Sequence, residues 1–172
     1  MKSGVLPSFA QYLLVLVFLL ASVLIQGRWG HSLIFHHARP DLSIVVVGAA
    51  AALLGWRRGA FFGLIGGLLS AALVPVNFGT QIVSFTLGGM VTGWLPALIA
   101  GDSPVLAVAS GLVCSSVIGL SATIFAPSHH LRTQFIAVVG QVSLNTLLGI
   151  PMFYLFKVLK IGAKQQDSLF DS

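Results

Sequence analysis

The sequence predicts an all-α membrane protein, a bundle of about six transmembrane helices. Two features of its composition point to lipid as the solvent for most of the chain. Of 172 residues, 56% are hydrophobic and only 8% are charged, whereas soluble domains average about 25% charged residues. One crossing of a bilayer takes roughly 20 residues. The length therefore allows about six crossings joined by short turns, with no separate globular domain.

Six apolar segments are the expected spans, each bounded by charged residues, glycine, proline or histidine. They cover residues 9–26, 41–56, 59–76, 79–100, 105–126 and 133–159, within a single membrane domain over residues 1–172. Pro40 suits the first turn of the second helix, and Asp41 suits the positive N-terminal end of its dipole. Arg57 and Arg58 are expected to form the tight turn before the third span.

The distribution of lysine and arginine predicts the orientation of the chain. With an even number of spans, both termini lie on one side, and that side collects six of the basic residues: Lys2, Arg57, Arg58, Lys157, Lys160 and Lys164. The other side has Arg28, Arg39 and Arg132. The positive-inside rule then predicts a multi-pass protein of the bacterial cytoplasmic (inner) membrane with both termini in the cytoplasm. Basic residues at helix ends suit lipid headgroups, and we expect no nucleic-acid partner.

Ionisable residues are missing from the middle of every predicted span. Proton relays, ion pumps and voltage sensors need such groups there. The four acids lie at helix ends or in the tail: Asp41, Asp102, Asp167 and Asp171. No paired carboxylates and no Ser-His-Asp set follow from this spacing. We therefore expect a protein that is not an enzyme, with no catalytic residues and no cofactor.

Five histidines fall in the two loops expected on the non-cytoplasmic side: His31, His36, His37, His129 and His130. Neutral imidazole binds transition metals. However, no cysteine joins these histidines, and Asp41 is the only carboxylate near them in the sequence. The pattern favours interfacial or partner-facing histidines, and no metal site is predicted.

Small residues recur at helical spacing in three of the predicted spans. The third span has Gly59, Gly63, Gly67 and Ala71, the fourth has Gly89 and Gly93, and the fifth has Ala107, Gly111, Ser115 and Gly119. Such stripes let helix backbones approach closely in lipid. They either hold the helices of this chain together or offer a docking face to another protein's helix. Our candidates for packing or partner binding are Pro40, Asp41, Gly59, Gly63, Gly67, Gly79, Gly89 and Gly93.

Polar side chains also fall in segments at lipid depth. Gln141 and Asn145 are one turn apart in the sixth span, which also contains Gln134, and Gln81 and Ser84 begin the fourth. Amides at this depth commonly hydrogen-bond between helices, for roughly 0.6–2 kcal/mol each. The alternative is a ligand pocket lined by amides and aromatic rings.

The region from Arg39 to Leu95 resembles a known family. Arg39-Pro40-Asp41-Leu42 opens an apolar span, Arg57-Arg58-Gly59 follows, then Gly63-Leu64-Ile65-Gly66-Gly67-Leu68-Leu69, and then Asn77-Phe78-Gly79. These motifs resemble the rod shape-determining membrane protein MreD family, which has a Pro-Asp pair at its second span, a basic turn followed by glycine, and a Gly-x-x-x-Gly-Leu pattern. One departure is Ala71, which stands where the family commonly carries an aspartate late in the third span.

The resemblance implies a non-catalytic scaffold of the bacterial cell elongation (Rod) complex that supports peptidoglycan synthesis and rod shape. Its implied partner is MreC, a single-span protein with a large periplasmic part. Further implied partners are RodA, its class B penicillin-binding transpeptidase, and the actin-like MreB.

A second interpretation starts from the fold that the resemblance implies. MreD-like bundles look similar to the substrate-binding S-components of energy-coupling-factor transporters, which capture a vitamin or metal from outside. In that case Gln81, Gln141, Asn145 and the outer histidines would line a pocket. A scaffold predicts a filled interior, whereas an S-component predicts a pocket open to the non-cytoplasmic side.

Overall fold

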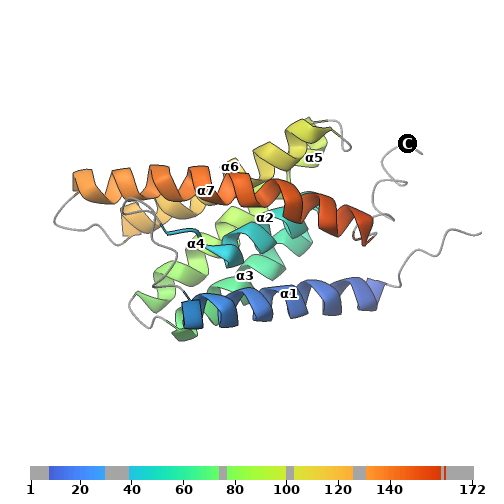
Figure 1. Ribbon diagram of the computed structural model, residues 1–172, viewed down its shortest axis with the longest axis horizontal. Helices are drawn as coiled ribbons and strands as arrows, with labels where there is room; N and C mark the ends of the chain where they lie inside the picture. The colour runs from blue at the N-terminus through green and yellow to red at the C-terminus, as the bar shows by residue number, and fades with distance from the viewer. Residues whose placement is uncertain are drawn as a thin grey trace, which may run out of the picture.

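The computed structural model describes residues 8–29, 39–73, 77–99, 103–125, 131–159 and 161, and these residues form helices and no strand. The helices are α1 (Ser8–Trp29), α2 (Leu42–Leu54), α3 (Trp56–Leu73), α4 (Phe78–Thr92), α5 (Leu95–Leu98), α6 (Pro104–Phe125) and α7 (Leu131–Val158). Figure 1 shows them as one bundle, with the first residues of α1 and the last residues of α7 at the same end. The predicted all-α class is confirmed.

Helix α2 is the centre of the bundle. It packs against each of the other six helices, and every residue from Ser43 to Leu54 is buried. Its sequence explains this position, because Leu42–Leu54 is apolar or small on all sides and has no polar face to turn outward. With only 13 residues, α2 is about 20 Å long, whereas the 28-residue α7 is about 42 Å long.

The turn between α2 and α3 differs from the predicted one. The chain reverses at Gly55, whose φ of 81° is a conformation that glycine adopts without strain. Arg57 and Arg58 lie inside the first turn of α3 instead of forming the turn. There the Arg57 guanidinium lies over the Trp56 ring at 5.2 Å, and that of Arg58 lies over the Tyr12 ring at 5.5 Å.

The predicted fourth span, residues 79–100, is divided in the structure. Helix α4 ends at Thr92, and the short α5 follows after Gly93 and Trp94. Pro96 explains the division, because proline has no N–H to donate within the preceding helix and suits the first turn of the next one. The other helices begin and end within three residues of the predicted spans.

Three of the described helices are long and apolar enough to cross a bilayer: residues 9–28, 104–125 and 132–158. This indicates a membrane protein. Helix α2 is apolar but shorter, and its burial at the centre explains why it needs no full crossing of its own. The number of about six spans stays a prediction.

Basic residues of the described segments divide evenly between the two ends of the bundle. Arg57 and Arg58 lie at the start of α3, where Arg58 lies over Tyr12 near the start of α1, and Lys157 is near the end of α7. At the opposite end, Arg28 is near the end of α1, Arg39 bonds to Gln26, and Arg132 is near the start of α7. We call these the Ser8 end and the Leu131 end. The predicted excess on one side thus depends on Lys2, Lys160 and Lys164, which are outside the described residues. The orientation stays a prediction.

Candidate functional site

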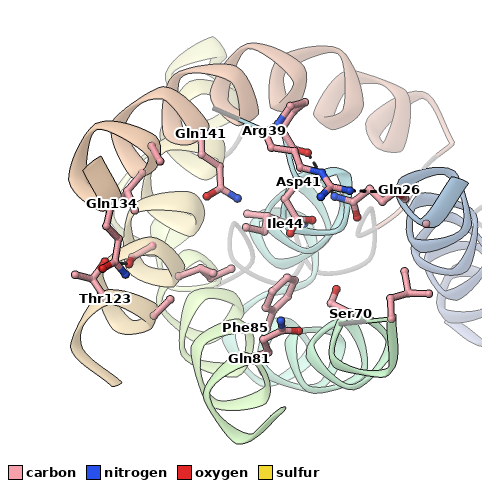
Figure 2. Close-up of a pocket in the computed structure, with 18 residues that line it drawn as sticks. Gln26, Arg39, Asp41, Ile44, Ser70, Gln81, Phe85, Thr123, Gln134 and Gln141 are labelled. Atoms are coloured by element: carbon pink, nitrogen blue, oxygen red, sulfur yellow. Dashed lines mark hydrogen bonds between the residues drawn. The ribbon is translucent and has the colours of Figure 1, made fainter. Parts of the chain in front are cut away.

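A cavity of about 610 Å³ lies beyond the N-terminal end of the short central helix α2. Because α2 begins partway along its longer neighbours, the axis of the bundle towards the Leu131 end has no helix to fill it. Figure 2 shows the ring of surrounding helices and the side chains that point inward from them. The lining residues come from α1, α3, α4, α6, α7, the segment before α2 and the first turn of α2. A volume of this size is in the range of small-molecule sites.

The floor of the cavity is the capped start of α2. Asp41 is the N-cap residue, and its Oδ1 accepts hydrogen bonds from the backbone N–H groups of Ser43 (2.9 Å) and Ile44 (3.3 Å). The sequence predicts Pro40 in the first turn of this helix. In the structure Pro40 instead precedes the N-cap residue Asp41. A carboxylate suits this position, because it satisfies free helix N–H groups and compensates the positive end of the helix dipole.

Asp41 lies near the middle of α7, not at the end of the bundle. Its backbone N–H donates to Asn145 Oδ1 at 2.8 Å, and Asn145 is one of the two central residues of the 28-residue α7. The sequence placed Asp41 at the end of a span and hence at the membrane surface. The structure places it deep because α2 is a half-length helix. The one signal in the sequence was the shortness of the predicted second span.

A polar network ties α1 to this junction. The Ser43 hydroxyl donates to Gln26 Oε1 at 2.9 Å, and Gln26 Nε2 donates to the Pro40 carbonyl oxygen at 3.4 Å. Ser22 Oγ donates to the Leu19 carbonyl oxygen at 2.7 Å and also lies 3.3 Å from Ser43 Oγ. The donors and acceptors of the floor are therefore largely engaged, as buried polar groups in lipid must be.

Two polar atoms of the residues around the cavity, Gln81 Oε1 and Ser70 Oγ, are buried behind its surface and have no hydrogen-bond partner among the described residues. Gln141 points inward from α7, while Ser70 and the ring of Phe85 point inward from the opposite side (Figure 2). Buried groups left unpaired cost free energy unless something else binds them.

Two residues with formal charges line the cavity, Arg39 and Asp41. Arg39 is exposed, and among the described residues no hydrogen bond or ion pair joins its side chain to that of Asp41. Arg39 donates instead to the Gln26 carbonyl oxygen at 3.5 Å (Figure 2). The described lining therefore has no net charge.

The glycine stripes face the interior of this chain. At Gly59, a Cβ atom would meet the Gly89 carbonyl oxygen, and at Gly63 it would meet that of Phe85. At Gly67 it would lie 2.8 Å from Ile82 Cα, and at Gly93 the backbone of Trp56 is as close. These four glycines, together with Gly89, thus fill the contacts between α3 and α4 and offer no free docking face. Gly79 is different, since nothing lies within 4 Å of its Cβ position.

The remaining predicted groups are placed as follows. Gln81, Gln134 and Gln141 line the cavity, whereas Asn145 is fully buried below it and binds Asp41. Ala71, where the family commonly has aspartate, is fully buried. The five histidines lie outside the described residues. Within the described part of the chain, no group of three His, Cys, Asp or Glu side chains is arranged to hold a metal ion.

Comparison with known proteins gives no relative. No family model matches the chain, and no curated protein or solved structure is significantly similar to it.

Proposed function

We propose that the chain is a non-catalytic membrane scaffold of the MreD type, which binds an MreC-like single-span protein in the bacterial cell elongation complex. Recognition of partners would occur mainly through lipid-exposed helix faces, because little of the described chain lies outside the bundle. In α7, for example, only 11% of the most apolar window is buried.

One observation supports this proposal above others: the residues that carry the resemblance build the centre of the bundle. The Pro40-Asp41 pair caps the central helix, and Gly59, Gly63 and Gly67 are places where a side chain would strike α4 or α2. Glycines match easily by chance between apolar sequences. Glycines that the packing requires are better evidence, because a shared pattern then reflects shared helix packing.

Native mass spectrometry of the chain co-expressed with an MreC-like protein tests the scaffold proposal. We expect a stoichiometric complex that survives gentle extraction, and no complex with an unrelated single-span protein of similar length. A chain that never retains the MreC-like protein, yet carries a small-molecule adduct, would overturn the proposal in favour of the second candidate.

The cavity favours that second candidate, a solute-binding component of the energy-coupling-factor type. Its particular support is that a glutamine from each of α1, α4 and α7 lines the same space: Gln26, Gln81 and Gln141. A scaffold has no need of a polar cavity of about 610 Å³. The two candidates differ in the binding surface: a scaffold binds its partner through the outer helix faces, and a solute-binding component binds its ligand in the cavity.

Thiol labelling tests whether water and solutes reach the cavity. We expect Gln141→Cys to react with a membrane-impermeant maleimide in intact cells, because position 141 lines the cavity. Leu147→Cys, on the exposed outer face of the same helix, should stay unreactive, since a thiolate does not form in lipid. Cys114 is fully buried and should react only after denaturation in detergent.

The labelling also reports the orientation. Reaction of Gln141→Cys in intact cells places the Leu131 end on the outer side, as both candidates require. Reaction only in inside-out vesicles would reverse the predicted topology. No reaction from either side would exclude the solute-binding candidate.

A further inference from the structure

We propose that the surface around Arg57 binds the anionic headgroup of a phospholipid, in the leaflet next to the Ser8 end of the bundle. Three features of α3 and its neighbours support such a site: unpaired positive charge, exposed tryptophan rings beside that charge, and an apolar stripe below it. A lipid site of this kind would serve a scaffold and a solute-binding component alike, since both are embedded in the same bilayer.

Positive charge gathers in the first turn of α3. Arg57 is exposed and Arg58 is half-buried, and no acidic residue lies in that turn. Cations at this end of a helix are opposed by the helix dipole, so the fold of α3 gives no reason for them. The one acidic residue of the described chain, Asp41, lies at the other end of α2. Arg57 therefore has no carboxylate partner among the described residues, and its charge is open to an anion from outside.

Exposed tryptophan rings surround the Arg57 side chain. Its guanidinium lies over the Trp56 ring at 5.2 Å, and Trp56 meets Trp94 edge to face, with ring centroids 6.4 Å apart. The exposed fractions of these two residues are 44% and 57%. Tryptophan is enriched at membrane–water interfaces, where its ring lies at the level of the lipid headgroups. The tryptophan pair thus indicates that Arg57 lies at the depth of the phosphate groups.

Below Arg57, the same face of α3 is apolar and exposed. Phe61, Leu64 and Leu68 follow at intervals of four, three and four residues, the spacing of one helix face, and all three are exposed. Helical side chains lean towards the N-terminus of their helix, so Arg57 reaches away from this stripe and leaves it to an acyl chain. An anionic phospholipid matches both parts, whereas free phosphate would use the charge alone.

Fluorescence quenching by brominated lipids tests the site, because two of the three tryptophans of the chain belong to it. In the Trp29→Phe variant, reconstituted in phosphatidylcholine vesicles, all tryptophan emission comes from Trp56 and Trp94. Dibrominated phosphatidylglycerol and dibrominated phosphatidylcholine are compared at equal mole fractions. We expect the anionic lipid to be preferred by at least about fivefold, since one arginine near an anionic surface contributes about that factor. Equal quenching by the two lipids would overturn the inference.

Substitutions at Arg57 separate a site from a general attraction of anionic lipid to a basic protein. Arg57→Gln removes the charge of an exposed side chain, so the preference should fall about fivefold. Arg57→Lys keeps the charge and should keep most of the preference. Arg132→Gln is the matched control, because Arg132 is also exposed in the first turn of a helix but belongs to α7 at the other end of the bundle. An unchanged preference in Arg57→Gln, or an equal loss in both glutamine variants, would contradict a site at Arg57.

Discussion

Replacement of Gly63 by alanine is expected to destabilise the bundle by about 2–3 kcal/mol, the cost of overpacking a well-filled interior. An added methyl group at this position would strike the carbonyl oxygen of Phe85 and come close to Thr86 Cα. Both are backbone atoms of α4, which cannot rotate away as a flexible side chain would. Equilibrium unfolding in mixed micelles, followed by tryptophan fluorescence, measures the change.

Gly79→Ala is the matched control, since it adds the same methyl group to a glycine of α4. Nothing lies within 4 Å of that position, and alanine favours a helix over glycine by about 0.5–1 kcal/mol. We expect no loss of stability, or a small gain. Equal destabilisation by both variants would show that α3 and α4 do not pack as described.

The contacts of the small residues could be anticipated from the sequence only in part. Spacing of four residues predicts that Gly59, Gly63 and Gly67 share one helix face. It does not say which helix lies opposite, because any apolar neighbour in lipid satisfies the same pattern. The structure shows that α4 covers this face, so the stripe serves packing within the chain.

The sequence offers a pocket lined by Gln81 and Gln141 as one alternative, and both residues line the cavity, but the sequence does not place that pocket at the start of α2. A segment as apolar as Leu42–Leu54 indicates burial, but its hydrophobicity is the same whether it crosses the membrane or ends halfway. The depth of Asp41 follows from contacts across about a hundred residues of chain, as in its hydrogen bond to Asn145. No local pattern encodes such a contact.

The junction between Asp41 and Asn145 gives the second large effect. Asp41→Ala removes the cap of the central helix, which typically costs about 0.5–2 kcal/mol. The N–H groups of Ser43 and Ile44, which are both buried, would then lose their acceptor, so we expect a value at the upper end. Asn145→Leu leaves the buried Asp41 N–H without its acceptor, at about 1–3 kcal/mol.

Asp41→Asn separates the hydrogen bonds of the cap from its charge. Asparagine is as good a cap as aspartate, so this variant should unfold within about 0.5 kcal/mol of the natural chain. A loss as large as that of Asp41→Ala would mean that the negative charge beside Arg39 matters more than the bonds to the helix.

A double-mutant cycle decides whether the two residues act as one unit. If the cap and the Asn145 bond hold the start of α2 together, either substitution releases the same segment, and the second adds little to the first. We therefore expect the combined loss to fall short of the sum by about 1 kcal/mol, within the range for residues in one network. Strict additivity would mean that the cap and the Asn145 bond stabilise the start of α2 independently of each other.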